Sequence, residues 1–221
     1  MATPNAEHAG KRSLRAALTL SVATLLSAAL LAFVFDATRD RIAEAERAGR
    51  MARFSAVLGD TRHDNDILND AIEVRDHELL GTAEAVPVFR IRLGNQPVAA
   101  VIMPVAPGGY GGPIRLVVGI DADGKLLGVR VFSHRETPGL GDDIDERKSD
   151  WILGFSGKSL EEPAPEKWKV RKDGGAFDQF TGATVTPRAV VNAVFKTLTY
   201  FEQNREMIFA EPATGMDPLE Q

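Results

Sequence analysis

The sequence predicts an α+β domain in which helices flank an antiparallel sheet, preceded by one N-terminal transmembrane helix. Three observations support this fold class. Residues 16–35 carry no charge, short alternating apolar runs fill the middle of the chain, and an apolar stripe at helical spacing comes near its end. Strands that follow one another directly, with helices before and after them, are typical of an antiparallel sheet.

Residues 16–35 have the length and composition of a membrane-spanning helix. A bilayer core about 30 Å thick takes about 20 helical residues at about 1.5 Å each, and this run also lacks glycine and proline. Three basic residues lie shortly before the run and two shortly after it, which favours a cytoplasmic N-terminus. We therefore expect a cytoplasmic tail over 1–15, a transmembrane helix over 16–36 and an exported remainder.

A cleaved signal peptide is the alternative interpretation of this segment, because positive charge followed by an apolar stretch is common to both. The run is longer than a usual signal-peptide core, and the first Ala-x-Ala after it, at 43–45, lies beyond a charged stretch. We favour the retained anchor. It makes the chain a single-pass membrane protein with an exported domain, and either interpretation exports the residues after 36.

Charge and composition exclude several kinds of partner. Asp and Glu (31) outnumber Lys and Arg (26), so nucleic acid is not expected, because phosphate contacts need clustered basic residues. Cysteine is absent, which excludes disulfides and thiolate-held Fe–S clusters. The four histidines are not spaced as zinc ligands, so no metal is expected. Any redox chemistry therefore requires an organic cofactor.

Helices are expected on both sides of the sheet in sequence. Residues 37–58 place apolar residues at helical spacing among Ala, Arg and Glu, which is typical of a helix that continues out of the membrane. A second short helix is expected over 66–72. The glycine-dense stretch 107–113 lacks the G-K-[ST] ending of a phosphate loop. It is expected to be a tight connection, with Tyr110 as a candidate for lining a site.

Two hairpins are expected to form most of the sheet. Residues 85–93 alternate apolar and polar towards their end, and their partner strand is expected over 97–105, across a turn at 94–96. Residues 114–120 and 126–132 flank the sequence Asp-Ala-Asp-Gly. This piece lacks the remaining ligands of a calcium loop, so it is expected to be a hairpin turn.

The last helix of the domain is expected to begin near residue 186. Thr186 suits the N-cap, where its hydroxyl can accept a hydrogen bond from the first turn. Pro187 suits the first helical position, because its missing N–H has no intrahelical partner there. The apolar stripe of this helix consists of Val190, Val191, Val194, Phe195, Leu198 and Phe201.

The loop before this helix is a candidate anion site. Free backbone N–H groups and the helix dipole favour a phosphate at a helix N-terminus. Gly182 and Ala183 let another molecule approach the backbone closely, and Thr184 places a hydroxyl there. The same pattern also fits an ordinary helix that starts after a Thr/Gly turn.

A family resemblance separates these two interpretations. The heptapeptide DQFTGAT, which begins at Asp178, matches the D-x-x-[ST]-G-A-[ST] pattern of proteins with phosphoester-linked FMN. The resemblance implies that a flavin transferase takes FMN from FAD and joins its phosphate to Thr184. Asp178, Thr181, Gly182 and Ala183 then belong to the recognition sequence. Covalent FMN is the implied cofactor, and the flavin transferase is a partner during maturation.

A second run found in the same family lies upstream. The sequence ETPGLG covers residues 136–141 and is a turn-rich loop that can bring backbone groups close to a flat ring. By resemblance, Glu136, Thr137, Gly139 and Leu140 are candidate cofactor-binding residues. Glu136 is expected to order its loop rather than to transfer protons, and no catalytic acid or base is required of the chain.

With both motifs behind a single N-terminal span, the chain resembles the RnfG (also RsxG) family over nearly its whole length. These are the G subunits of Rnf-type ion-translocating electron transport complexes. The resemblance implies an electron-carrier subunit, rather than a stand-alone enzyme, that relays electrons through FMN during ion-coupled transfer between NADH and ferredoxin. Its partners would be the other subunits and membrane lipid. Residues 37–208 would form the periplasmic FMN-binding domain and 209–221 a flexible tail.

Three alternatives stay open. The C subunit of the sodium-translocating NADH:quinone reductase is organised similarly, although the segment TGATVTPRAVVNAV favours the RnfG branch. A membrane-tethered module could use its flavin as a sensor, and NADH-driven electron transfer that depends on Thr184 would argue against this. A structural anchor with an unmodified motif would be colourless.

Overall fold

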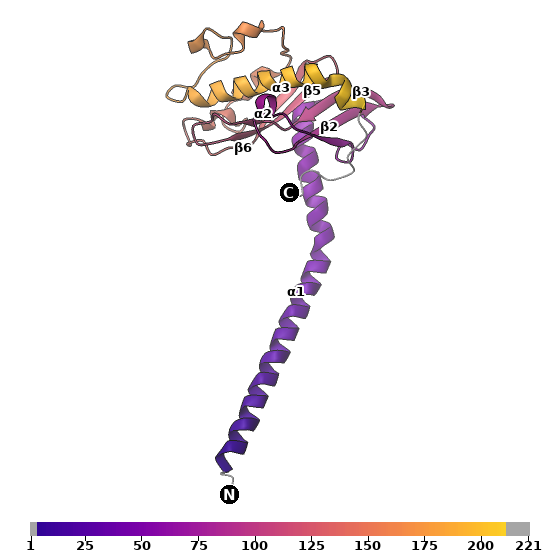
Figure 1. Cartoon of the computed structure of the whole chain (residues 1–221), viewed down its shortest axis with the longest axis vertical. Coiled ribbons are helices and arrows are strands. Elements are labelled where there is room, and N and C mark those ends of the chain that lie inside the picture. Colours follow the sequence, from indigo (N-terminus) through magenta and orange to yellow (C-terminus); the bar gives the residue numbers. More distant parts are fainter. Residues whose placement is uncertain (1–3, 211–221) are drawn as a thin grey trace. The chain divides into compact units, whose positions relative to one another are not determined.

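The computed structural model describes residues 4–210, so the expected tail beyond 210 lies outside the described residues. The chain divides into two compact units, Met1–Arg50 and Met51–Gln221. Helix α1 (Pro4–Leu58) makes up the described part of the first unit, and its last turns belong to the second (Figure 1). Within α1, Leu20–Arg39 is long and apolar enough to cross a membrane. This confirms the expected N-terminal apolar helix.

Within the described residues of the second unit, six strands form one antiparallel sheet. The strands are β1 (Ala71–Val74), β2 (Val86–Leu93), β3 (Gln96–Ile102), β4 (Val105–Ala106), β5 (Ile114–Asp121) and β6 (Leu126–Ser133). Their order is β1-β2-β3-β5, and both β4 and β6 pair with β5. The two expected hairpins, β2–β3 and β5–β6, are confirmed. Gly94 and Asn95 turn the first one with φ angles of 55° and 65°, as a two-residue hairpin turn requires.

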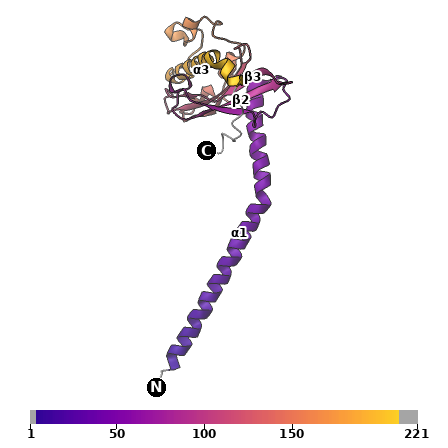
Figure 2. The same cartoon turned by 45° about the vertical axis from the view of Figure 1, so that its right-hand side comes forward.

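Helix α3 lies across one face of this sheet (Figures 1 and 2). The helical elements that follow α1 are α2 (His77–Leu80), the short 3-10 helices η1 (Asp142–Ile144), η2 (Asp150–Phe155), η3 (Pro165–Lys167) and η4 (Arg171–Asp173), and α3 (Val185–Ala210). In both views the orange segment that contains η3 and η4 lies on the side of α3 that faces away from the sheet. Helix α3 ends at Ala210, two residues after the expected end of the domain.

The alternation of side chains along the strands produces two apolar cores, one on each face of the sheet. Val88 on β2 is fully buried in the core beneath α3. Its neighbour Phe89 is fully buried in the other core, together with Phe54 and Leu58 from the last turns of α1. Each large apolar side chain buried in this way contributes roughly 1.5–3 kcal/mol. The sheet is therefore held by helices on both faces.

Two paired glycines let the end of α1 approach the sheet closely. Gly119 on β5 lies opposite Gly128 on β6. A β-carbon on either one would lie about 3 Å from the carbonyl oxygen of Val57, at 2.9 and 3.0 Å respectively. Any larger residue at these positions would push the helix end away from the strands.

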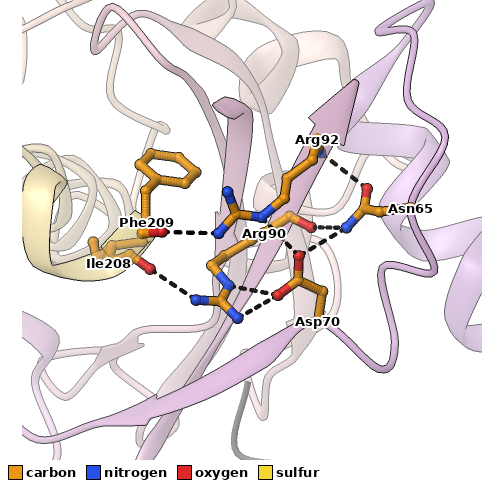
Figure 3. A network of polar contacts seen from close by, with 6 residues as sticks. All are labelled: Asn65, Asp70, Arg90, Arg92, Ile208 and Phe209. Carbon is orange, nitrogen blue, oxygen red and sulfur yellow. Dashed lines mark hydrogen bonds and ion pairs between the residues drawn. The ribbon is translucent and has the colours of Figure 1, made fainter. Parts of the chain in front are cut away.

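A polar network joins β2 to the C-terminal end of α3 (Figure 3). Arg90 donates a hydrogen bond to the carbonyl of Ile208 (3.3 Å), and Arg92 donates one to the carbonyl of Phe209 (2.9 Å). Both guanidinium groups also pair with Asp70, at 2.7 and 2.9 Å from their Nε atoms. The last carbonyls of a helix lack intrahelical donors and carry partial negative charge. The two arginines therefore hold the end of α3 against the sheet.

The prediction of a short helix over 66–72 is wrong. The chain makes a single turn there, closed by the Asp70 N–H on the carbonyl of Asp66 (3.0 Å), and β1 begins at Ala71. Ala71 and Val74 are buried and pair with β2. Pairing at the sheet edge satisfies the backbone hydrogen-bonding groups and also buries these side chains. This stabilises a strand more than the weak local helical pattern stabilises a helix.

Candidate functional site

The loop before α3 is built on a tight turn. The N–H of Ala183 donates to the carbonyl of Phe180 (3.2 Å), and Gly182, at the third position of the turn, has a φ of 80°. A type II turn requires a positive φ at this position, which glycine adopts without strain. Thr181 and Gly182 are exposed. The turn therefore presents its backbone to solvent.

Thr184 lies immediately before α3. Its carbonyl accepts a hydrogen bond from the N–H of Arg188 (3.3 Å), which places Thr184 at the N-cap position of the helix. The prediction that Thr186 is the N-cap is wrong. Thr186 lies in the first turn of the helix, is fully buried, and donates its hydroxyl to Glu136 (2.5 Å). This buried carboxylate is a partner from another segment that the local pattern does not show. The Thr184 side chain is half-buried, and its hydroxyl has no hydrogen-bond partner among the described residues.

Glu136 is the buried centre of the site. One carboxylate oxygen accepts from Thr186 on α3, and the other accepts from the N–H of Gly111 in the glycine-dense loop (3.0 Å). A β-carbon at Gly109 or Gly141 would lie only 2.8 or 2.4 Å from the same carboxylate. Glu136 thus joins the glycine loop, its own loop and the start of α3.

The loop that follows Glu136 is a closed turn. The carbonyl of Thr137 accepts from the N–H groups of Leu140 (3.1 Å) and Gly141 (3.2 Å). Gly139 has a φ of 78° and donates its N–H to the buried carboxylate of Asp142 (2.6 Å). Asp142 was not among the candidate site residues, although its position one residue after the glycine-rich turn is a usable signal for such an acceptor.

Three exposed apolar side chains belong to these loops. Leu140 lies against the turn before α3, because a β-carbon on Gly182 would lie 3.6 Å from its Cδ2 atom. Val185 follows Thr184 directly, and Tyr110 lies in the glycine loop that contacts Glu136. Their exposed fractions are 45%, 45% and 76%. Large apolar side chains exposed beside a polar loop are typical of a binding surface.

Asp178 lies on the flank of the turn and is exposed. Its carboxylate forms an ion pair with Arg171 (3.0 Å), and its carbonyl accepts from the indole N–H of Trp151 (2.9 Å). Trp151 packs edge-on against Phe180, with ring centroids 5.1 Å apart. Trp151 thus supports the first part of the motif. No local pattern marks this role, because the partners are 27 positions apart.

The residues of this loop fit a phosphate-linked planar group. Thr184 offers a hydroxyl that no described residue engages, at the start of a helix whose first N–H groups lack intrahelical acceptors. The exposed side chains of Leu140, Val185 and Tyr110 offer apolar surface to a flat ring. The structure thus brings the two sequence motifs together at one end of α3.

Comparison with known proteins defines first the class of the protein. The family model of the FMN-binding domain matches residues 109–199, which include both motifs and most of the glycine loop. A second family model, the RnfG N-terminal region, matches residues 1–57. The chain is therefore an FMN-binding-domain protein with an N-terminal region of the RnfG type.

Whole-chain relatives identify the family. The chain is 46% identical over 204 residues to the G subunit of the ion-translocating oxidoreductase complex of Shewanella loihica, covering 92% of this chain and 96% of the relative. It is 49% identical over 203 residues to the G subunit of the same type of complex from Pseudomonas aeruginosa, with 91% and 95% covered. The chain belongs to the RnfG family of G subunits, and the family prediction is confirmed.

Proposed function

We propose that this chain is the electron-transfer subunit of a membrane-bound, Rnf-type ion-translocating oxidoreductase complex, and that it carries FMN on Thr184 through a phosphoester. The observation that carries this proposal is the free hydroxyl of Thr184 at the start of α3, within the D-x-x-T-G-A-T motif. The FMN-binding domain match and the names of the relatives support the same function.

The attachment reaction needs only the threonine oxygen from this chain. The Thr184 hydroxyl oxygen bonds to the FMN phosphorus of FAD, the pyrophosphate P–O bond breaks, AMP leaves, and the hydroxyl proton is released. A flavin transferase supplies the catalysis. Asp178 and Thr181 are exposed, which leaves the motif accessible to such an enzyme, and Gly182 allows close approach to the backbone.

After attachment, the residues of the chain hold and orient the cofactor. The N-terminal N–H groups of α3 favour the phosphate by their charge and direction. Leu140, with Thr137 and Gly139 in the same loop, offers a surface to the ring. Glu136 holds this loop in place through its hydrogen bonds with Gly111 and Thr186. FMN accepts and releases electrons one or two at a time. The protein keeps the cofactor at one point between its redox partners, and no residue here needs to act as an acid or base.

We also propose the arrangement in the cell. The N-terminal tail lies in the cytoplasm, the helix over 16–36 spans the inner membrane, and residues 37–208 form the periplasmic FMN-binding domain. The excess of basic residues before the span supports this orientation. The other subunits of the complex relay electrons between NADH and ferredoxin through this flavin, and lipid surrounds the span.

The mass of the Thr184 peptide tests the proposal. We expect the full-length protein, produced with a flavin transferase and exported, to gain the mass of FMN less one water on this peptide. The denatured protein band should also fluoresce. Thr184→Ser keeps a hydroxyl and should keep the flavin, whereas Thr184→Ala should lose it.

The same variants test electron transfer. Thr184→Ala lies in a loop and should leave the amount of folded protein unchanged, while NADH-driven electron transfer in isolated membranes is lost. An FMN-sized mass on the Thr184→Ala peptide, or an unmodified peptide from the wild type, would refute covalent attachment at this residue.

A further inference from the structure

A basic strip flanks the flavin motif. We use this name for Lys167, Lys169, Arg171, Lys172 and Arg188, all of which have exposed side chains. The strip contrasts with the chain as a whole, whose formal net charge is −5. Four of its residues come from the sequence KWKVRK, in which Trp168 and Val170 are buried between basic residues. The fifth, Arg188, lies at the end of the first turn of α3.

Packing holds the strip in one conformation. Val170 is fully buried and forms a bridge with Phe177, and the N–H of Arg171 donates to the Phe177 carbonyl (2.7 Å). Trp168 packs between Phe177 and Phe195 of α3, with ring centroids 5.0 and 5.7 Å away. The charged side chains therefore project from a folded segment rather than from a solvated tail.

Direct contacts link the strip to the motif. Arg171 forms its ion pair with Asp178, and the N–H of Lys172 donates to the side-chain oxygen of Gln179 (3.1 Å). Arg188 lies one helical turn after Thr184. Arg171, Lys172 and Arg188 therefore lie beside the motif.

The strip keeps a surplus of positive charge. Asp173 forms two hydrogen bonds with Arg188 (2.7 and 2.9 Å), and Asp178 pairs with Arg171. Lys167, Lys169 and Lys172 have no carboxylate partner among the described residues. Arg188 lowers the pKa of Asp173 most, and Lys172 and Lys169 lower it further.

The preceding part of the same loop is acidic, so the charge changes sign along it. The acidic residues there are Glu161, Glu162 and Glu166. Among the described residues they form no ion pair with the strip. The end of the loop that adjoins the flavin motif is the basic one, and a partner that approaches the motif would meet mainly that end.

We propose that the basic strip is the docking surface for an acidic protein surface on another subunit of the complex, which exchanges electrons with the flavin at Thr184. The inference rests on the proposed function. Complementary charge steers such encounters and sets their orientation. The flavin transferase is a less suitable occupant, because four of the five cations precede the motif and the fifth follows it, so none lies within the recognition sequence that the resemblance implies.

The test compares two double charge reversals in the full-length chain within its complex. Lys169→Glu with Lys172→Glu alters the strip. Arg62→Glu with Arg75→Glu is the matched control, because both residues are exposed and flank β1, at the edge of the sheet far from β6 in strand order. Lys169→Arg with Lys172→Arg keeps the charge.

The first readout is the flavin mass on the Thr184 peptide, which we expect in every variant. The second is NADH-driven electron transfer in native membranes and in the detergent-solubilised complex. The strip reversal should slow it about tenfold at low salt in both preparations. The difference in rate between the strip reversal and the wild type should become smaller at high salt, because salt screens exposed charges. The control and the arginine variant should behave like the wild type.

Each other outcome overturns a different statement. Wild-type protein without flavin would refute the proposed function itself. With flavin present throughout, equal rates for the strip reversal and the control would refute the docking surface. Flavin lost only from the strip reversal would assign the strip to the transferase, and a defect confined to membranes would assign it to anionic lipid headgroups; both results would overturn the inference.

Discussion

At the scale of single residues, the site depends on a buried carboxylate more than on the motif alone. Glu136 receives hydrogen bonds from Gly111 and from Thr186, which lie 25 positions before it and 50 after it. Thr184, the proposed attachment residue, is two positions from Thr186. The position of the Thr184 hydroxyl is therefore tied to Glu136 through the first turn of α3.

Replacing Glu136 tests this dependence. Glu136→Ala leaves the fully buried Thr186 hydroxyl without its acceptor, and one unpaired buried group costs about 1–3 kcal/mol. The N–H of Gly111, an exposed residue, also loses its acceptor but can bind water instead. We expect a lower midpoint of urea unfolding and a smaller fraction of protein carrying flavin. Glu161→Ala, at an exposed position, serves as the control. Unchanged stability and flavin content in Glu136→Ala would show that the carboxylate does not hold the site together.

At the scale of elements, α3 is held at both ends. Its first turn is bound to Glu136 through Thr186, and its last carbonyls are bound by Arg90 and Arg92 (Figure 3). Between these ends, a stripe of buried apolar residues covers the sheet. The helix that follows the D-x-x-T-G-A-T motif is therefore fixed to the sheet along its length.

Asp70 is the residue on which the C-terminal attachment of α3 depends. Its removal leaves Arg90, which is 2% exposed, without its carboxylate, and breaking a buried ion pair in this way costs about 3–5 kcal/mol. We expect Asp70→Ala to lower the free energy of unfolding by that amount, measured by urea denaturation of the detergent-solubilised chain. Asp60→Ala, at an exposed position, should change it little. Equal stability of the two variants would contradict the role given to the network.

At the scale of the whole molecule, the chain combines an apolar helix with an acidic α+β domain. The helix Leu20–Arg39 and the sheet domain belong to different compact units. The domain carries its reactive loop at one end of α3, beside a strip of opposite charge to the chain. This organisation suits a domain that is tethered to a membrane and exchanges electrons with neighbouring subunits.

Retention of the apolar helix as an anchor can be tested directly. Two arginines in the span, Leu25→Arg with Leu26→Arg, cost roughly 2.5–3.5 kcal/mol each in a bilayer core. We expect the wild type to stay in the membrane pellet after an alkaline wash, and this variant to appear in the soluble fraction or fail to insert. Leu25→Ala with Leu26→Ala should stay in the pellet. Release of the wild type with a shortened N-terminus would identify a cleaved signal peptide instead.

The sequence by itself determined the parts of this protein that depend on neighbours in the chain. The apolar run, the two hairpins and the final helix follow from composition and periodicity, because each forms from contiguous residues. The flavin motif could also be recognised, since it is a contiguous pattern of seven residues whose resemblance to a family is specific.

Only the tertiary structure decided which separate segments meet. It placed β1 where a local pattern indicated a helix, because Ala71 and Val74 pair with β2. It moved the start of α3 to Val185, because Thr186 turns inward to Glu136. It also brought the ETPGLG loop against Gly182. Such contacts join residues tens of positions apart, and their free energy depends on burial and hydrogen bonding in three dimensions, which no local pattern records.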